Sequence, residues 1–193
     1  MGRPSKKAER TEEIFQAFQR CVLRFGLEGS TLERIAEEAG LQRSLVRHYV
    51  GNRSELIEQL ADRTIEQSNQ QWISLENYLP NSDLSNALLD MLFDYENSSD
   101  LSLLFQALLF SASQDESLKQ KLRGWTEHNI TAINNLLRKD YPDVNTEKLD
   151  AVSFGLLSLY FNLDSLSPLG LISDYRLPAK QAAMQLLKSL HTD

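Results

Sequence analysis

The sequence predicts an all-α fold of about nine helices, with a small N-terminal domain at residues 1–53 and a larger helical domain at residues 54–193. Apolar residues recur at three- and four-residue steps along most of the 193-residue chain, which is the spacing of one helix face. No stretch shows the alternation typical of β-strands. Glycine and proline are few, at 8 and 5 residues, and several of them separate the periodic stretches.

The segment from residue 30 to residue 56 predicts two short helices joined by a tight turn. Ser30 and Glu33 have the spacing of a capping box, so the first helix is expected to begin at Ser30 or Thr31. Gly40 then provides a residue that adopts the left-handed conformation needed to end that helix. The Ala-Gly-Leu turn that results is also found in ordinary helical hairpins, so by itself it does not define a function.

The second short helix is predicted from about residue 42 to residue 49. Val46 and Val50 lie four residues apart and form its apolar face. Its opposite face is basic and rich in hydrogen-bonding groups, which a helix that enters a DNA major groove requires. The residues on this face are Arg43, Ser44, Arg47 and His48. Asn52 and Glu55 form another capping box, which predicts the start of the next helix.

Upstream, apolar periodicity from Thr11 predicts one more helix, which Gly26 ends. Together the three helices form a module of about 50 residues. Cys21 lies on the apolar face, so packing is favoured over redox chemistry. Arg3 and Lys6 belong to a short basic arm, which we expect either to contact DNA phosphates and the minor groove or to remain a solvated terminus.

Charge is divided unevenly along the chain. Residues 1–55 carry 10 Lys/Arg and 8 Asp/Glu, whereas the remainder carries 10 and 19, and the net charge is −7. The front of the protein can therefore approach phosphate while the rear repels it, although an acidic rear also serves solubility. No signal peptide or membrane span is present and only one cysteine occurs, so we expect a cytoplasmic protein without a membrane partner.

The region IFQAFQRCVLRFGLEGSTLERIAEEAGLQRSLVRHYVGNRSEL resembles the DNA-binding domain of the TetR family of bacterial repressors. The match runs over some 45 residues without an insertion. The matching residues are Ile14, Ala17, Gly26, Thr31, Ile35, Ala36, Ala39, Gly40, Leu41, His48, Tyr49, Gly51, Arg53 and Leu56. Two positions depart from the family pattern: Arg47 replaces a residue that is often aromatic, and Val50 replaces Phe.

The resemblance implies which residues contact DNA. Those expected to face the groove are Arg43, Ser44, Leu45, Arg47 and His48. Those expected to hold phosphates are Tyr49, Arg53 and the helix start at Ser30 and Thr31, which would use free backbone N–H groups. Arg47 is able to clamp a phosphate or to read a guanine. Two structural alternatives remain open, namely that Tyr49 is half-buried against the first helix and that Arg53 pairs with Glu37 or Glu55.

The rest of the chain predicts further helices at residues 54–78, 84–95, 101–112, 113–137, 146–163 and 177–190. The segment at 101–112 is apolar almost all round, which predicts a central buried helix. Pro178 is expected in the first turn of the last helix, after a loop from Asp164 to Arg176. The last two helices resemble the family's dimer interface and predict a homodimer, although they could instead complete a monomeric core.

The family usually encloses a small-molecule effector among its middle helices. Candidate lining residues are Trp72, Phe105, Phe110, Trp125, His128 and Tyr160, each of which also suits plain core packing. The three histidines have no metal-ligand spacing and no nucleophile or phosphate-binding motif occurs, so neither an enzyme nor a cofactor is expected. The sequence thus predicts a repressor released from a palindromic operator by a small molecule, with an architectural DNA binder and a helical protein-interaction module as alternatives.

Overall fold

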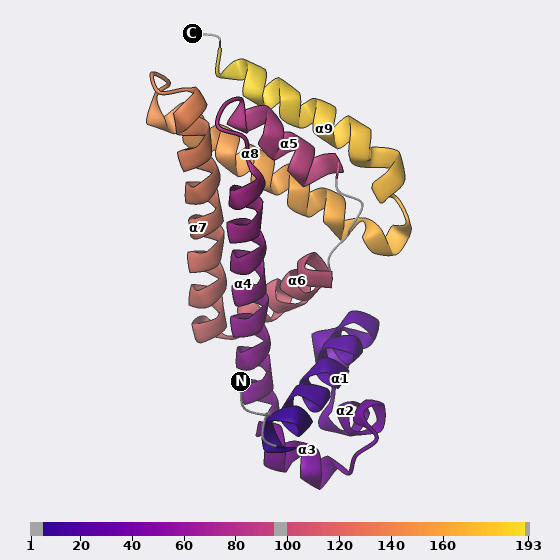
Figure 1. The fold of residues 1–193 in the computed structure, drawn as a ribbon. Helices are drawn as coiled ribbons and strands as arrows, with labels where there is room; N and C mark the ends of the chain where they lie inside the picture. The colour runs from indigo at the N-terminus through magenta and orange to yellow at the C-terminus, as the bar shows by residue number, and fades with distance from the viewer. Residues whose placement is uncertain (1–5, 95–99, 192–193) are drawn as a thin grey trace. The chain divides into compact units, whose positions relative to one another are not determined.

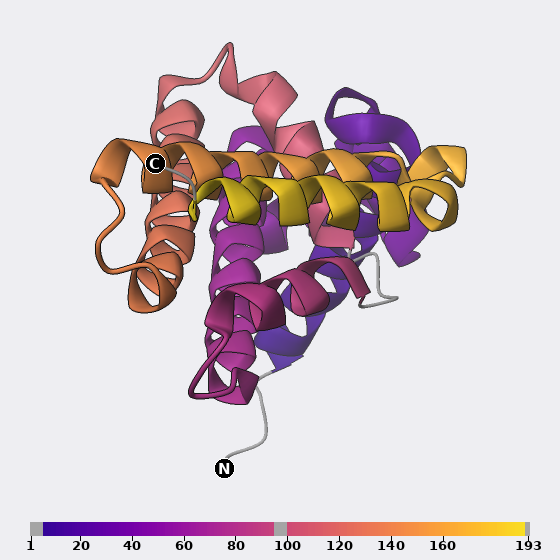
Figure 2. The ribbon, with the colours of Figure 1, turned by 90° about the horizontal axis from the view of Figure 1, so that it is seen from above.

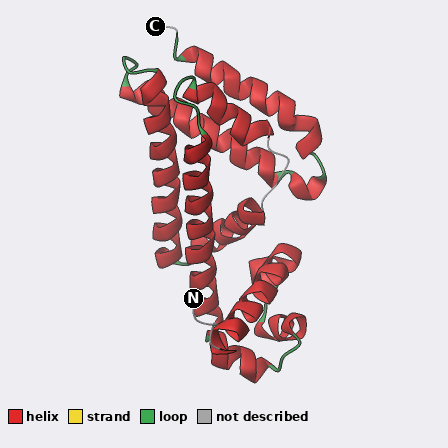
Figure 3. Ribbon diagram, in the orientation of Figure 1, coloured by secondary structure: helices red, strands yellow, loops and turns green. Residues whose placement is uncertain are grey.

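A computed structural model describes residues 6–94 and 100–191 of the chain. Within these ranges the secondary structure consists of nine α-helices and one short 3₁₀-helix, with no β-strand (Figures 1 and 3). The predicted all-α fold class is therefore confirmed. In the part of the chain so described, no helix has both the length and the apolar character that a membrane span needs.

The chain packs into two compact units, which differ from the predicted division at residue 54. The first unit contains the residues up to Gln67 together with Leu103–Leu122. The second contains Ser68–Ser102 together with the residues from Arg123 onward. Packing units need not coincide with functional domains, so the domain boundary between residues 53 and 54 stays a prediction.

Helix α1 spans Lys6–Gly29 and begins before the predicted start at Thr11. Gly26 interrupts it with φ 71° and ψ 170°, a conformation that ends regular helix geometry as the sequence predicts. Cys21 is buried on the packed face, and burial raises the pKa of its thiol. A raised pKa disfavours the reactive thiolate, which agrees with a packing role.

Helix α2 spans Leu32–Ala39, and its N-cap residue is Thr31. The Thr31 side chain accepts a hydrogen bond from the Arg34 backbone N–H at 3.3 Å. The predicted capping box of Ser30 and Glu33 is therefore wrong by one residue. Ser30 is fully buried, and its hydroxyl donates to the Gly26 carbonyl oxygen at 2.7 Å instead. Both adjacent hydroxyl residues are favourable N-cap residues, and burial decides between them.

Gly40 ends α2 in the left-handed conformation, with φ 64° and ψ 35°. Helix α3 then spans Arg43–Val50, close to its predicted limits. Gly51 follows at φ 79°, and Asn52 accepts a hydrogen bond from the Glu55 backbone N–H at 3.0 Å. This cap begins helix α4, which spans Arg53–Tyr78. The predicted turns at Gly40 and Gly51 are both confirmed, because each depends only on residues close to it in the sequence.

Helices α1, α2 and α3 pack against one another around a shared apolar core (Figure 1). Its fully buried side chains include Ile14, Phe15, Phe18, Ile35 and Val46. The start of α4 joins this group through Arg63, whose guanidinium carbon lies 3.9 Å from the Phe15 ring centroid. Arg63 also pairs with Glu12 at 2.6 Å, so α4 is anchored to α1 by both a cation–π contact and an ion pair.

The second unit is built around a core shared by α5, α7, α8 and α9. Helix α5 spans Leu84–Asp94, and α7 spans Glu116–Asp140. Asp140 accepts hydrogen bonds from both the Ser85 backbone N–H at 2.7 Å and the Ser85 hydroxyl at 2.8 Å. The carboxylate at the end of α7 thus caps the start of α5. The predicted extension of α5 to Tyr95 lies outside the described residues.

Helix α6 spans Asp100–Ala112 and is only partly buried. Leu104, Phe105 and Leu108 are buried, but Leu109 is 47% exposed and Phe110 is 81% exposed. The prediction of a helix buried on all sides is therefore wrong at its C-terminal end. An apolar stretch shows that burial is favourable, but it does not show whether another element is present to cover each face.

Helix α8 spans Thr146–Ser165, and α9 spans Ile172–Ser189, with a short 3₁₀-helix at Ser167–Leu169 between them. The predicted loop from Asp164 to Arg176 is therefore mostly helical. Pro178 lies inside α9 rather than in its first turn, which corrects the predicted start at Leu177. Helices α8 and α9 run side by side in both views (Figures 1 and 2).

Candidate nucleic-acid interface

Helix α3 is buried on one face and open on the other. Val46 is fully buried and Val50 nearly so, and both pack toward α1 and α2. The side chains on the opposite face are exposed and are those of Arg43, Ser44, Leu45, Arg47 and His48. The structure therefore brings together on one surface the five residues that the sequence predicts to face a DNA groove.

The two arginines of this face differ in their local partners. Arg43 forms an ion pair with Glu33 of α2, with 2.8 Å between Nη1 and Oε1. Both side chains are more than half exposed, so the pair contributes little to stability and a phosphate is able to compete for Arg43. Arg47 is exposed and has no ion-pair partner among the residues that the structure describes. It is the cation of this face most available to a ligand.

His48 and Tyr49 contact each other at the end of α3. Their ring centroids lie 5.3 Å apart with the planes nearly perpendicular, which is a favourable edge-on arrangement. Tyr49 is half-buried, as its structural alternative predicted. A half-buried tyrosine still presents its edge to solvent, so the predicted phosphate contact of Tyr49 stays a prediction.

The start of α2 offers backbone rather than side-chain donors. Thr31 is exposed, but its hydroxyl oxygen already accepts from the Arg34 N–H. The Ser30 hydroxyl is enclosed and engaged. The backbone N–H groups of Ser30 and Thr31 donate to the Leu27 and Gly29 carbonyl oxygens at 3.2 Å and 3.1 Å, so the N–H groups predicted to hold a phosphate are not free in this geometry. The N–H groups in the first turn of α2 have no partner within the helix, and they point toward any anion at its N-terminus.

Arg53 joins the start of α4 to the end of α1. Its Nη2 donates to the Leu27 carbonyl oxygen at 2.9 Å and lies 3.1 Å from the Glu28 carboxylate. The predicted alternative partners were Glu37 and Glu55, and the observed one is Glu28. A guanidinium held in this way is less available to phosphate, so Arg53 positions the helices around the interface.

The basic arm is only partly described. Lys6 is exposed in the first turn of α1, where its ammonium group is free to approach a phosphate. Arg3 lies outside the described residues. The predicted arm contacts therefore remain predictions for both residues.

Sequence reasoning missed two residues beside this surface. Gln42 is the exposed N-cap residue of α3, but its side chain makes no capping hydrogen bond, so its amide is free to reach a base edge. Arg34 donates to the Gly29 carbonyl oxygen at 2.7 Å and stacks on the Phe25 ring at 4.7 Å. A poor capping residue at the start of a basic helix was the available signal for Gln42. No sequence signal pointed to Arg34, because its contacts with Gly29 and Phe25 form only when the chain folds.

The six candidate effector residues do not share one packing unit. Phe105 and Phe110 belong to the first unit, and the other four belong to the second. In the second unit Trp125 and Tyr160 both contact the Phe161 ring, at 5.4 Å and 5.8 Å between centroids. Trp72 is half-buried and donates from Nε1 to Glu76 at 3.2 Å.

His128 is exposed, whereas its neighbour Asn129 is buried and donates to the Trp125 carbonyl oxygen at 2.8 Å. Consecutive helical residues point in different directions, so the His128 and Asn129 side chains do not form a polar pair. The exposed positions of His128 and Phe110 do not suit residues that line an enclosed cavity.

A buried carboxylate lies beside Tyr160. Asp164 accepts a hydrogen bond from the Ser102 hydroxyl at 2.6 Å, and the Tyr160 hydroxyl also bonds to it. Burial raises the pKa of Asp164 above its ordinary value, and the two hydrogen bonds and the charge of Arg176 oppose that rise. Burial and the nearby Asp164 charge also raise the pKa of Tyr160. Sequence reasoning placed Asp164 in a loop and therefore missed this cluster.

Comparison with known proteins identifies the class to which this architecture belongs. No protein-family model matches the chain. Over 154 residues the chain is 25% identical to the HTH-type transcriptional regulator BetI of Vibrio vulnificus, covering 78% of this chain and 76% of BetI.

Solved structures are similar over nearly the whole chain. A putative TetR-family transcriptional regulator from Mesorhizobium loti has a TM-score of 0.71 at 14% identity, with 97% of both chains covered. A TetR transcription regulator from Haloarcula marismortui has a TM-score of 0.69 at 20% identity, covering 94% of this chain and 98% of that one. The multidrug binding protein EbrR, complexed with imidazole, has a TM-score of 0.58 at 18% identity, covering 92% and 94%.

The fold of this chain is similar to that of TetR-family transcriptional regulators. The resemblance predicted from the residues between Ile14 and Leu56 is thereby confirmed. The relatives named above are described as transcriptional regulators or, for EbrR, as a multidrug binding protein.

Proposed function

We propose that this protein is a dimeric, ligand-responsive transcriptional repressor that acts in the bacterial cytoplasm. The observation that carries the proposal is the exposed face of α3, which presents Arg43, Arg47 and Leu45, with Gln42 exposed at its N-cap. Such a helix combines donors for base edges and phosphates with an apolar side chain that suits a thymine methyl group. The N-terminus of α2 adds backbone donors for a phosphate.

A short reading helix needs a second copy to be specific. Two heads related by a twofold axis bind half-sites about 34–36 Å apart and therefore select a palindrome. The proposed dimer surface is formed by α8 and α9, whose exposed apolar side chains include Phe154, Tyr175, Leu177 and Met184. Gly155 supports close packing of these helices, because an added Cβ there would lie 2.8 Å from a Leu186 methyl carbon.

The dimer is tested by sedimentation of the Phe154→Asp variant. Phe154 is 59% exposed in the single chain, so an aspartate there leaves the protomer folded but places an unpaired charge in the interface. We expect the dimer dissociation constant to rise by roughly 100-fold or more. Tyr78→Asp is the matched control, because Tyr78 is 85% exposed on α4. A dimer unchanged by Phe154→Asp contradicts the proposed surface.

The proposed repressor responds to a small-molecule effector. A ligand that converts 99% binding-competent protein to 1% must prefer the incompetent state by roughly 10⁴-fold. The description of EbrR as a multidrug binding protein supports a small-molecule effector for this chain as well. Two of the candidate lining residues, Trp125 and Tyr160, contact the same ring, that of Phe161.

Selection from a random DNA pool tests the regulator function directly. We expect a palindrome to be enriched and to bind roughly 10³-fold or more above scrambled DNA at about 150 mM salt. A weak affinity that salt abolishes, without a consensus, would indicate an architectural DNA binder. An absence of DNA binding would contradict both functions and favour a protein-interaction module.

A further inference from the structure

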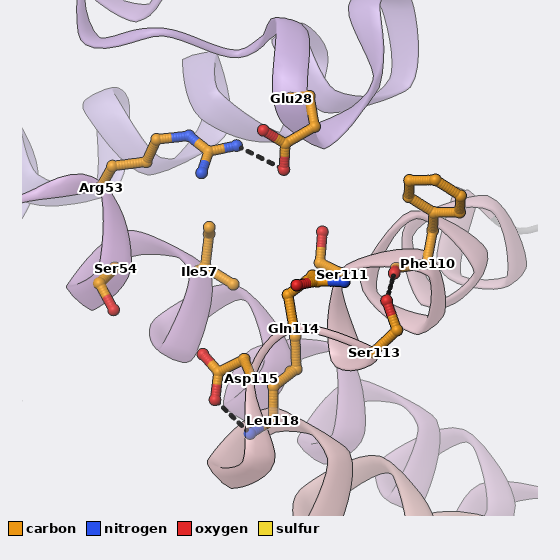
Figure 4. Close-up of a pocket in the computed structure, with 10 residues that line it drawn as sticks. All are labelled: Glu28, Arg53, Ser54, Ile57, Phe110, Ser111, Ser113, Gln114, Asp115 and Leu118. Carbon is orange, nitrogen blue, oxygen red and sulfur yellow. Dashed lines mark hydrogen bonds and ion pairs between the residues drawn. The ribbon is translucent and has the colours of Figure 1, made fainter.

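A pocket of about 490 Å³ lies within the first unit, between the start of α4 and the segment that joins α6 to α7 (Figure 4). We call it the junction pocket and define it by Glu28, Arg53, Ile57, Phe110, Asp115 and Leu118. Its volume falls within the range of about 300–1,000 Å³ that small-molecule sites occupy. The predicted effector residues do not describe it, since Phe110 alone belongs to both sets.

One side of the junction pocket is apolar. Phe110 exposes 81% of its surface, which is unusual for an aromatic side chain on a helix whose other face is packed. Leu118 is buried behind the pocket, and Ile57 is half-buried on the side formed by α4. A ligand that covers the Phe110 ring would remove apolar surface from water, which stabilises the bound state.

The charges of the pocket are two carboxylates and one guanidinium. The guanidinium of Arg53 is already engaged by the Leu27 carbonyl oxygen and by one oxygen of Glu28. Asp115 accepts a hydrogen bond from the Leu118 N–H at 3.0 Å through one oxygen only. The lining thus keeps a net negative charge beside an exposed aromatic face, and both features attract a cation.

The pocket also contains a polar group that the protein leaves unsatisfied. The Ser111 hydroxyl oxygen is buried and has no hydrogen-bond partner among the residues that the structure describes. Buried polar atoms in folded proteins are nearly always hydrogen-bonded. Figure 4 shows Ser111 on the pocket wall beside Gln114.

We propose that the junction pocket binds an organic monocation with an apolar body. Its charge lies near Glu28 and Asp115, and its apolar part covers Phe110. The site contacts Arg53, which joins α4 to the end of α1, so the ligand is in contact with the helices that position α3. The inference is independent of DNA binding, since it concerns only the pocket and its ligand.

Two probes of equal shape and opposite charge test the proposal by isothermal titration calorimetry on the full chain without DNA. Tetraphenylphosphonium and tetraphenylborate each carry four phenyl groups, and a sodium buffer keeps both in solution. We expect the phosphonium to bind roughly tenfold tighter than the borate. We expect Phe110→Ala to weaken phosphonium binding roughly fivefold, with a smaller loss for Glu28→Gln.

Matched variants separate this site from general adsorption. Tyr78→Ala removes a similarly exposed aromatic ring, and Glu37→Gln removes an exposed carboxylate on α2; neither should change the phosphonium affinity. Circular dichroism of each variant confirms that it is folded. Equal affinity for the two ions, or wild-type affinity in Phe110→Ala, overturns the proposal. Because no DNA is present, these outcomes do not depend on whether the regulator function is correct.

Discussion

The exposed face of α3 and the exposed face of the α8–α9 pair present opposite chemistry, although each of these helices also packs buried side chains on its inner side. On α3 the outward side chains are mainly cationic or hydrogen-bonding, such as Arg43 and Arg47. On α8 and α9 they include large apolar residues such as Phe154 and Leu177. The difference shows that the outer face of a helix specifies its partner, since charged donors suit a polyanion and apolar side chains suit another protein surface.

The two regions also differ in what holds them together. The turns around α2 and α3 depend on single residues, namely Thr31, Gly40 and Asn52, each of which acts on its own helix end. The second unit depends on contacts between residues far apart in the chain, such as that between Ser85 and Asp140. Substitutions should therefore separate stability from DNA binding in the first region and affect stability most in the second.

The largest effect on stability is expected for Leu156→Ala in α8. Leu156 is fully buried, so the substitution removes apolar contacts and leaves a cavity, which costs about 2–5 kcal/mol of unfolding free energy. Leu45→Ala on α3 removes the same side chain at 39% exposure and should stay within about 0.5 kcal/mol of wild type. Urea denaturation at a fixed protein concentration measures both. Equal losses of unfolding free energy in Leu156→Ala and Leu45→Ala would contradict this expected difference.

A smaller loss is expected for Arg53→Ala. The variant removes the hydrogen bond to Leu27 and the pair with Glu28, and partial exposure limits the cost to about 1 kcal/mol. If Arg53 acts only by positioning helices, the dependence of DNA affinity on salt should keep its wild-type slope. A slope reduced by about one would instead show that Arg53 binds a phosphate directly, as the family resemblance implies.

Removing the cap of α2 tests whether Thr31 rather than Ser30 begins that helix. Thr31→Ala should cost about 1 kcal/mol, because it leaves the Arg34 N–H without its acceptor. Thr31→Ser retains a hydroxyl oxygen at the same position and should recover most of that loss. Thermal unfolding followed by circular dichroism compares the variants. Full stability of Thr31→Ala would mean that the cap does not contribute.

The smallest effect is expected at Asp164 and appears only as a function of pH. Burial raises the pKa of this carboxyl above its ordinary value of 3.8, so the folded state keeps the proton at pH values where the unfolded state has lost it. The contribution of Asp164 to stability therefore falls as pH rises from 3.8 through the folded-state pKa. Asp164→Asn should lack this fall while keeping an acceptor for Ser102. Parallel pH profiles of the two proteins would contradict the assignment.

Local signals in the sequence predicted the first region well and the second less well. Gly26, Gly40 and Gly51 each determine a turn through their own backbone conformation, so their roles were visible without a structure. The choice between Ser30 and Thr31 as the cap was not, because it depends on which hydroxyl the core encloses. Exposure of Phe110 could not be predicted either, since it depends on which distant element covers that helix face.

For the candidate interface too, features set by local sequence were predicted and contacts between distant residues were not. The outward face of α3 was predictable because helical periodicity together with Val46 and Val50 fixes which side faces inward. The Arg53–Glu28 contact joins residues from two helices and required the packed arrangement. Asp164 was missed for a related reason, since its burial depends on Ser102 and Tyr160 rather than on its neighbours in sequence.

We propose that the outer face of α3 reads DNA, and a base-by-base binding profile tests this function most directly. Each base pair of the selected half-site is replaced in turn, and the affinities of wild type, Arg47→Ala and Arg123→Ala are compared. Arg123 is a matched control because it is an exposed arginine on α7. We expect Arg47→Ala to lose about 1–3 kcal/mol of binding free energy and to discriminate less at one base pair, while Arg123→Ala matches wild type. Identical profiles for all three proteins would contradict it.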